Sequence, residues 1–512
     1  MTLRQAIGLA VAIATAVSAL AIAPLPVAAH AIGQVFTLPV PLALYLTGAG
    51  LAVAASFVVS VVVVRPAGRA PRYPTWRLPE WLARNASALL QALGLAWWLY
   101  LIFAGFTADT ISPLPAILFW IGLWIGLPIV AIVLGNPWPG LSPFRTLFRV
   151  LESVARRLGL DRLDAGLSYP RTLGRWPAVI FLFAALWAEL VLPESEGPRA
   201  VGTLLLGYTG LTLLGMILFG RVAWLRNAEL FEVLLGWFGR LGPLGRRVVE
   251  PTVCEGCADQ CDPERCVDCP ECAAAAESGE RAVELRPWFT GLTEVRAADF
   301  SDAGFIVLAL AGVTYDGLQE TGFYGSLMTP IFTAFWETFG ALNTVLLIQT
   351  AGLIAVWIAF MVAFLIAVLL TLSLHDPERR HEPLGGMAGA YAATLLPIAA
   401  GYLIAHYLTV LIQGVAWLPA LLADPLATVA PSLDWIPISV VWYLSVGAIV
   451  GGHIVAVVLA HRAALRDSSS RPVLAGLPLV ALMVAYTVLS LWIIAAPITL
   501  EPGVTPTALL AR

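Results

Sequence analysis

Residues 343–373 read NTVLLIQTAGLIAVWIAFMVAFLIAVLLTLS and contain no charged side chain. At a rise of about 1.5 Å per residue, a helix of this length exceeds the roughly 30 Å hydrocarbon core of a bilayer. A helix satisfies its own backbone polar groups in lipid, and an unbroken apolar run this long is typical of a transmembrane helix. The run therefore places the chain among integral membrane proteins.

The composition extends this prediction to the whole chain. Of its 512 residues, 59% are hydrophobic and 12% are charged, and the mean hydropathy is +0.85, whereas about 25% of residues in soluble domains are charged. Comparable apolar segments lie near 40–64, 86–106, 114–134, 177–193, 200–220, 303–320, 387–412, 437–461 and 473–496. We predict an all-α, polytopic helix bundle with about ten transmembrane helices, whose partner is the lipid bilayer and not nucleic acid.

The first 29 residues resemble a secretory signal peptide. Arg4 precedes an apolar run, Pro24 and Pro26 end that run, and 27–29 are small residues suited to cleavage. Cleavage there would make His30 the mature N-terminus, where its amine and imidazole could bind copper together. The alternatives are that His30 is only the first residue after the cut, or that the segment remains as an uncleaved anchor.

Arginines indicate the orientation, because cytoplasmic loops are enriched in basic residues. All 29 basic residues are arginine, and they gather in alternate loops, after 40–64, 114–134 and 200–220. We therefore predict a bacterial inner-membrane protein with both mature termini outside. Its predicted parts are a signal peptide (1–29), a five-helix half (30–220), a cytoplasmic loop (221–301) and a second five-helix half (302–512).

The predicted cytoplasmic loop contains every cysteine of the chain. These are Cys254, Cys257, Cys261, Cys266, Cys269 and Cys272. In a reducing compartment such close spacing favours metal binding over disulfides, and C-x2-C pairs let two thiolates hold one ion. Four thiolates suit zinc, and the run from Cys266 to Cys272 also matches three ligands of a [4Fe-4S] cluster. Free thiols and metal sensing remain as alternatives.

A second group of ionisable residues is predicted inside the membrane, where such groups are costly and usually functional. Glu189 and Asp316 each stand fourteen residues beyond a charged residue at the start of their segment. Both should therefore lie about 21 Å from the cytoplasmic surface of the membrane. His406 falls near the same outer level. A site formed by Glu189, Asp316, Glu320, His406 and His30 could bind copper or another divalent metal, or relay protons. The alternative is a set of separate hydrogen-bonded polar residues.

Two further segments differ from plain connectors. Asn136–Arg175 contains an amphipathic stretch with arginines on one face, which we expect to lie along the membrane surface. Tyr315–Gly340 is too polar for a lipid-facing helix and too apolar for a solvated loop, so we expect it to fold back onto the outer side of the bundle.

Several short strings resemble one known family. They are Asn136-Pro137-Trp138, Thr314-Tyr315-Asp316-Gly317, Ala405-His406-Tyr407-Leu408-Thr409 and Ser490-Leu491-Trp492-Ile493. They are similar to a family of polytopic bacterial membrane proteins known after the membrane subunit of fenitrothion hydrolase. The resemblance implies other subunits of a membrane complex and a link to organophosphate hydrolysis. The dense cysteine run departs from that family pattern.

The sequence therefore predicts an outer polar or metal site together with a cytoplasmic zinc or iron–sulfur loop. Its function would be small-molecule or metal handling, with hydrolase activity suggested by the family resemblance alone. Two alternatives remain open. One is a redox subunit passing electrons from a cytoplasmic iron–sulfur cluster, and the other is a transporter coupled to metal or protons.

Overall fold

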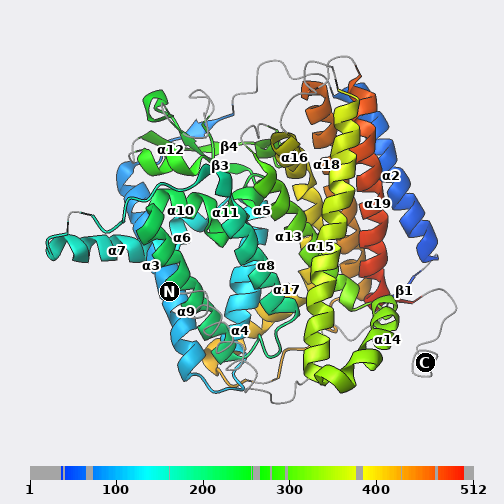
Figure 1. Cartoon of the computed structure of the whole chain (residues 1–512), viewed down its shortest axis with the longest axis horizontal. Coiled ribbons are helices and arrows are strands. Elements are labelled where there is room, and N and C mark those ends of the chain that lie inside the picture. Colours follow the sequence, from blue (N-terminus) through cyan, green and yellow to red (C-terminus); the bar gives the residue numbers. More distant parts are fainter. Residues whose placement is uncertain are drawn as a thin grey trace.

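The computed structural model describes residues 36–38, 41–64, 73–160, 162–254, 257, 266–276, 280–293, 298–375, 384–427, 429–467 and 471–500. Helices dominate these residues, and the predicted all-α membrane bundle is confirmed (Figure 1). The predicted signal peptide, His30 and Cys261 lie outside the described residues.

Among the described residues, nine helical segments are long and apolar enough to cross a membrane. They are α2 (Leu42–Val63), α3 (Glu80–Thr107), the run of α4 (Leu114–Ala116), π-helical η1 (Ile117–Gly126) and α5 (Leu127–Val133), η2 (Arg171–Leu173) with α8 (Trp176–Leu190), α9 (Pro198–Phe219), α15 (Ala341–Ser373), α16 (Leu384–Ala392) with η8 (Ala393–Leu395) and α17 (Leu396–Ala423), α18 (Ile438–Asp467) and α19 (Pro472–Ile498).

Helix α13 (Phe300–Gln319), which corresponds to the apolar segment near 303–320, carries two aspartates and is not among the nine. Strand β1 (Phe36–Thr37) pairs in parallel with β5 (Thr499–Leu500), so these two strands lie at one end of the bundle.

The bundle is built around α13, which is buried along almost its whole length. It packs against α8, α15, α16 and α17. On one side, α2 packs against α18 and α19 although it belongs to the other end of the sequence (Figure 1). Glycine residues let neighbouring helices pack closely. A Cβ on Gly401 of α17 would come within 2.3 Å of the Ala448 carbonyl oxygen of α18.

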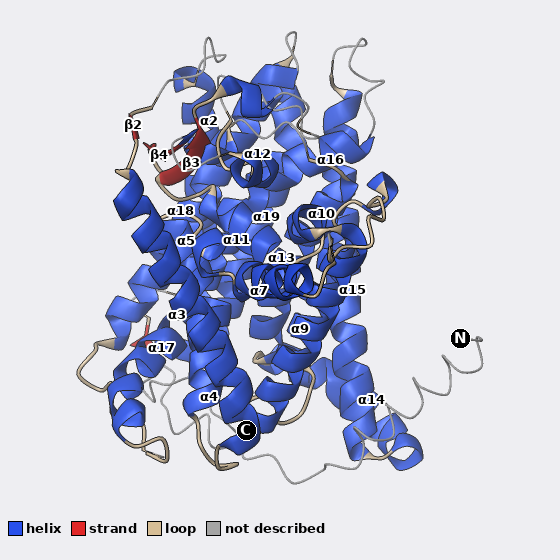
Figure 2. Cartoon of the chain, turned by 90° about the vertical axis from the view of Figure 1, so that its left-hand side faces the viewer, coloured by secondary structure: helices blue, strands red, loops and turns tan. Residues whose placement is uncertain are grey.

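A small polar domain, here called the thiol domain (residues 244–293), lies at the end of the bundle opposite β1 and β5 (Figures 1 and 2). Its antiparallel sheet has the order β2-β4-β3. The strands are β2 (Thr75–Trp76), β4 (Arg281–Leu285) and β3 (Leu244–Val248), and the short helices are η3 (Pro251–Cys254), α12 (Pro270–Ala275) and η6 (Thr290–Leu292).

Shorter helices lie between the long ones. They are α6 (Trp138–Leu141), α7 (Pro143–Arg157), α10 (Arg221–Asn227) and α11 (Leu230–Gly239). One of them, α10, packs against α12 of the thiol domain. Helix α7 projects sideways (Figure 1) and leaves Val150, Leu151 and Val154 exposed beside arginines, as expected for a helix at a membrane surface.

The segment expected to fold back outside the membrane divides in two. Tyr315 and Asp316 belong to the last turn and a half of α13, which continues to Gln319. Residues Gly322–Phe339 form a separate helix, α14, which packs against α15 near the end of the bundle where β1 lies (Figure 1).

Candidate functional site

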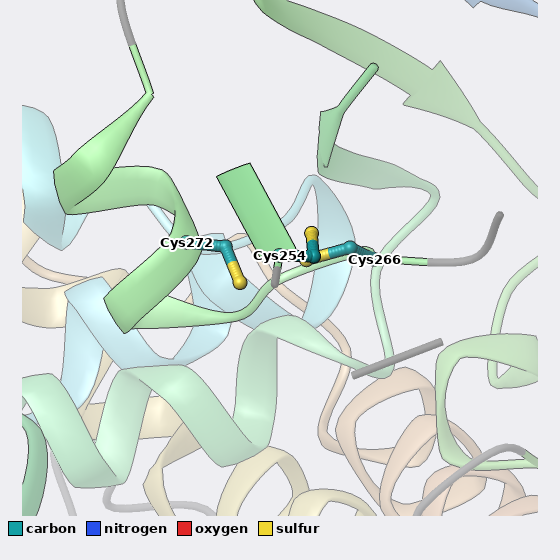
Figure 3. Close-up of side chains that lie close together, drawn as sticks. All are labelled: Cys254, Cys266 and Cys272. Atoms are coloured by element: carbon teal, nitrogen blue, oxygen red, sulfur yellow. The ribbon is translucent and has the colours of Figure 1, made fainter. Parts of the chain in front are cut away.

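The thiols of the thiol domain come from three short elements that converge. Cys254 ends η3, Cys269 is the N-cap residue of α12, and Cys272 lies one turn into that helix. Cys266 is fixed by its backbone, since its carbonyl oxygen accepts a 3.0 Å hydrogen bond from the Val248 amide of β3. Cys254, Cys266 and Cys272 point toward one another in Figure 3.

The five described thiols form a group that could hold metal. The sulfurs of Cys254, Cys266 and Cys272 lie within 4.8 Å of one another, and so do those of Cys257, Cys269 and Cys272. All five are buried and none forms a disulfide. Burial raises the pKa of the Cys272 thiol, so the thiol is neutral until a metal displaces its proton.

Arginines compensate the negative charges around these thiols. Arg286 pairs with Asp268 at 2.8 Å, and the Arg246 amide donates to the same carboxylate. Burial opposes ionisation of Asp268, but these two arginines outweigh it and hold the pKa of Asp268 below its usual range. Arg226 of α10 pairs with Glu271 at 2.6 Å and so ties α12 to the bundle.

The second site lies within the bundle and joins four helical segments. The Tyr407 hydroxyl of α17 is 2.7 Å from Asp316 Oδ2 of α13 and 2.9 Å from Glu189 Oε1 of α8. His406 Nε2 lies 2.9 Å from the same Asp316 oxygen. Trp124 of η1 donates its indole N–H to the other Glu189 oxygen at 2.8 Å. We call Trp124, Glu189, Asp316, His406 and Tyr407 the membrane site.

An ion pair sets the register that brings the two carboxylates together. Arg175, at the start of α8, pairs with Asp302, in the first turn of α13. Because Glu189 and Asp316 each follow these residues by fourteen positions, both are about 21 Å further along parallel neighbouring helices. The prediction that Glu189 and Asp316 lie at the same depth in the bundle therefore agrees with the structure.

The number of hydrogens available for hydrogen bonding limits the protonation states of the two carboxyl groups in the membrane site. The neutral Tyr407 hydroxyl has one hydrogen, and it lies within hydrogen-bond distance of two carboxyl groups. If both were ionised, the hydroxyl could donate to only one of them and would face the other with a lone pair. Both contacts are satisfied when one carboxyl is protonated and donates to Tyr407 while Tyr407 donates to the other.

The surroundings of the membrane site are tight and apolar. Tyr402 stacks on His406 with ring centroids 6.0 Å apart. Gly317 permits α13 to approach, because a Cβ there would lie 2.6 Å from the Tyr402 hydroxyl. A cavity of about 40 Å³ borders Trp124, Glu189 and Tyr407, which is room for one or two waters.

The structure brings together most of the predicted site residues. Glu189, Asp316 and His406 share one cluster, and Glu320 ends α13 close enough for its charge to interact with that of His406. Tyr407 and Trp124 were not predicted. Tyr407 follows His406 directly, and neighbours in a helix point about 100° apart, so only the packing of α17 against both α8 and α13 reveals its role.

No protein-family model, no curated protein and no solved structure matches this chain.

Proposed function

We propose that this chain is a polytopic membrane protein that exchanges protons for a divalent cation at the membrane site and carries a zinc-binding domain on the cytoplasmic side. The observation that carries the proposal is the Tyr407 hydroxyl between the Glu189 and Asp316 carboxyl groups. The arginine-rich loops, together with α13 counted as a tenth crossing, support placing the thiol domain on the cytoplasmic side of a bacterial inner membrane and both termini outside.

The membrane site combines a proton store with metal ligands. Two ionised carboxylates in an apolar bundle would be costly, and a shared proton lowers that cost. Carboxylates and imidazole are also ligands for divalent metal ions. A cation entering between Glu189, Asp316 and His406 would displace the proton, so protons and cation would compete for the same side chains. Such competition is the basis of coupled transport.

The spacing of the thiols favours zinc over an iron–sulfur cluster. Cys257 Sγ and Cys269 Sγ lie 3.7 Å apart, and a tetrahedral ion with bonds of about 2.3 Å holds its sulfurs about 3.8 Å apart. A [4Fe-4S] cluster would stand between its thiolates and keep them apart. The thiol geometry therefore argues against a [4Fe-4S] cluster at these cysteines.

Hydrolysis is the second candidate. The family resemblance suggests it, together with other subunits, and the carboxylate, carboxylate and imidazole of the membrane site form a ligand set that could hold a water-activating metal. Copper bound by His30 would belong to this version. Organophosphate turnover that disappears in His406→Ala, with the thiol-bound metal retained, would favour it.

Proteoliposomes test the transport proposal. With a pH-sensitive dye inside and the membrane potential clamped, adding Zn²⁺, Mn²⁺ or Mg²⁺ outside is expected to release protons in the wild type. The release should fall at least tenfold in Glu189→Gln and Asp316→Asn, and remain in Glu337→Gln, which alters an exposed carboxylate of α14. Unchanged proton release in the double variant Glu189→Gln/Asp316→Asn would contradict the proposal.

A further inference from the structure

The described thiols are arranged as two triplets that share one sulfur. Cys254 and Cys266 belong to one triplet, Cys257 and Cys269 belong to the other, and Cys272 belongs to both. Among these five thiols, no four lie within 4.8 Å of one another. The arrangement therefore has two centres instead of one.

A single tetrahedral ion would require a different arrangement. It would gather four ligand atoms, each about 3.8 Å from the other three when all are sulfur. Two ions with a common ligand instead give two separate groups that meet at one bridging thiolate. The observed triplets fit the second pattern, with Cys272 at the position of the bridge.

A carboxylate lies beside the second triplet without joining it. Glu271 Oε2 lies 3.7 Å from Cys257 Sγ, but the groups of ligand atoms that lie within 4.8 Å of one another do not include it. Arg226 holds this carboxylate at 2.6 Å. Glu271 therefore stands as an outer partner of the thiols.

The position of Cys272 suits a bridge. It is fully buried at the centre of the five thiols, and α12 fixes its backbone. Cys269, at the N-cap of the same helix, belongs to one of the two triplets. A thiol that contacts two cations loses its proton more readily than a thiol that contacts one.

We propose that the thiol domain binds two divalent ions of the zinc class, bridged by the Cys272 thiolate. This inference rests on the proposed zinc binding. It adds the number of ions bound per chain and the Cys272 thiolate that they share. Both are tested separately from the presence of metal.

Elemental analysis of the purified full-length protein gives the first test. We expect two zinc ions per chain in the wild type, one in Cys254→Ser, one in Cys257→Ser, and none in Cys272→Ser. One zinc in the wild type would overturn the two-ion inference and leave zinc binding intact. No metal in the wild type, even after incubation with Zn²⁺, would overturn both.

A titration of the wild-type protein with Co²⁺ avoids any doubt about folding of the variants. After removal of zinc, the electron paramagnetic resonance signal should rise with the first equivalent of Co²⁺ and fall with the second, because a shared thiolate couples the two spins. A signal that doubles at two equivalents would mean two unbridged ions and would overturn the bridge. Saturation at one equivalent would overturn the second ion.

Discussion

The thiol domain and the membrane site both concentrate acidic groups, but they compensate the negative charge in opposite ways. In the thiol domain three described carboxylates pair with arginines, in the pairs Arg286–Asp268, Arg226–Glu271 and Arg247–Glu284. In the membrane site the partners of Glu189 and Asp316 are a tyrosine, a tryptophan and a histidine. Fixed cations suit a site that holds metal permanently, whereas exchangeable hydrogens suit a site that changes its protonation.

The Arg175–Asp302 pair gives the largest expected effect, because it is the arginine-compensated pair that sets the register of the membrane site. Arg175→Ala would leave a buried aspartate without its cation, at a cost of about 3–5 kcal/mol in the free energy of unfolding. Denaturant unfolding in detergent measures this.

The control is Arg162→Ala, whose partner Asp164 is two residues away in sequence and whose side chain is 70% exposed. Its cost should stay within about 1 kcal/mol. The double variant Arg175→Ala/Asp302→Asn should recover part of the loss. A double variant as destabilised as the sum of its single changes would contradict the ion-pair account.

Glu229 is a buried carboxylate outside the membrane-spanning segments, and its neighbours are hydrogen-bond donors instead of arginines. Burial raises its pKa from 4.5 to about 7, against the opposing effect of the Tyr208 hydroxyl. The folded state keeps the proton between pH 4.5 and pH 7, whereas the unfolded chain loses it. Stability should therefore fall as pH rises through this window and level off above it, by roughly 3 kcal/mol in total.

Glu229→Gln should flatten that part of the curve of melting temperature against pH, because an amide does not titrate. Glu80→Gln, an exposed residue at the start of α3, should keep the wild-type slope. The interpretation fails if wild type and Glu229→Gln lose stability equally between pH 4.5 and pH 7.

Gly317 tests how closely the membrane site is packed. In Gly317→Ala the new Cβ would lie 2.6 Å from the Tyr402 hydroxyl and 2.7 Å from Ile493 Cγ2. We expect a loss of about 1–3 kcal/mol from overpacking, together with weaker proton exchange as α13 moves away from His406. Gly325→Ala in α14, where a Cβ meets nothing within 4 Å, should instead stabilise the protein by up to about 1 kcal/mol. Equal effects would contradict the close approach.

Glu271 should give the smallest effect. Glu271→Gln removes a negative charge beside Cys257 and leaves all thiols in place, so zinc affinity should fall by up to about tenfold. Competition with a fluorescent chelator measures this. Glu250→Gln, before η3, is the control. Equal affinities in the two variants would show that the Glu271 carboxylate does not support zinc binding.

The two regions also differ in how far the sequence could predict them. The thiols lie within nineteen residues, Cys254 to Cys272, so their spacing alone predicts a metal site. Glu189, Asp316 and His406 come from distant helices, and counting residues from Arg175 and Asp302 predicts a shared depth. The neighbours Trp124 and Tyr407 could not be predicted, because helix rotation decides which side chains face one another. The sharing of Cys272 by two triplets depends on the fold of α12 and η3 in the same way.

Infrared spectroscopy tests the central claim, that the membrane site stores a proton on a carboxyl group. Glu229 also carries a proton near neutral pH, so the spectra are recorded in a Glu229→Gln background. There we expect the C=O stretch of a protonated carboxylic acid, which is lost when Glu189→Gln and Asp316→Asn are added together and shifted when Tyr407→Phe is added. The exposed control Glu337→Gln should retain it unchanged. An identical carboxylic acid band with and without the added pair Glu189→Gln/Asp316→Asn would contradict the claim.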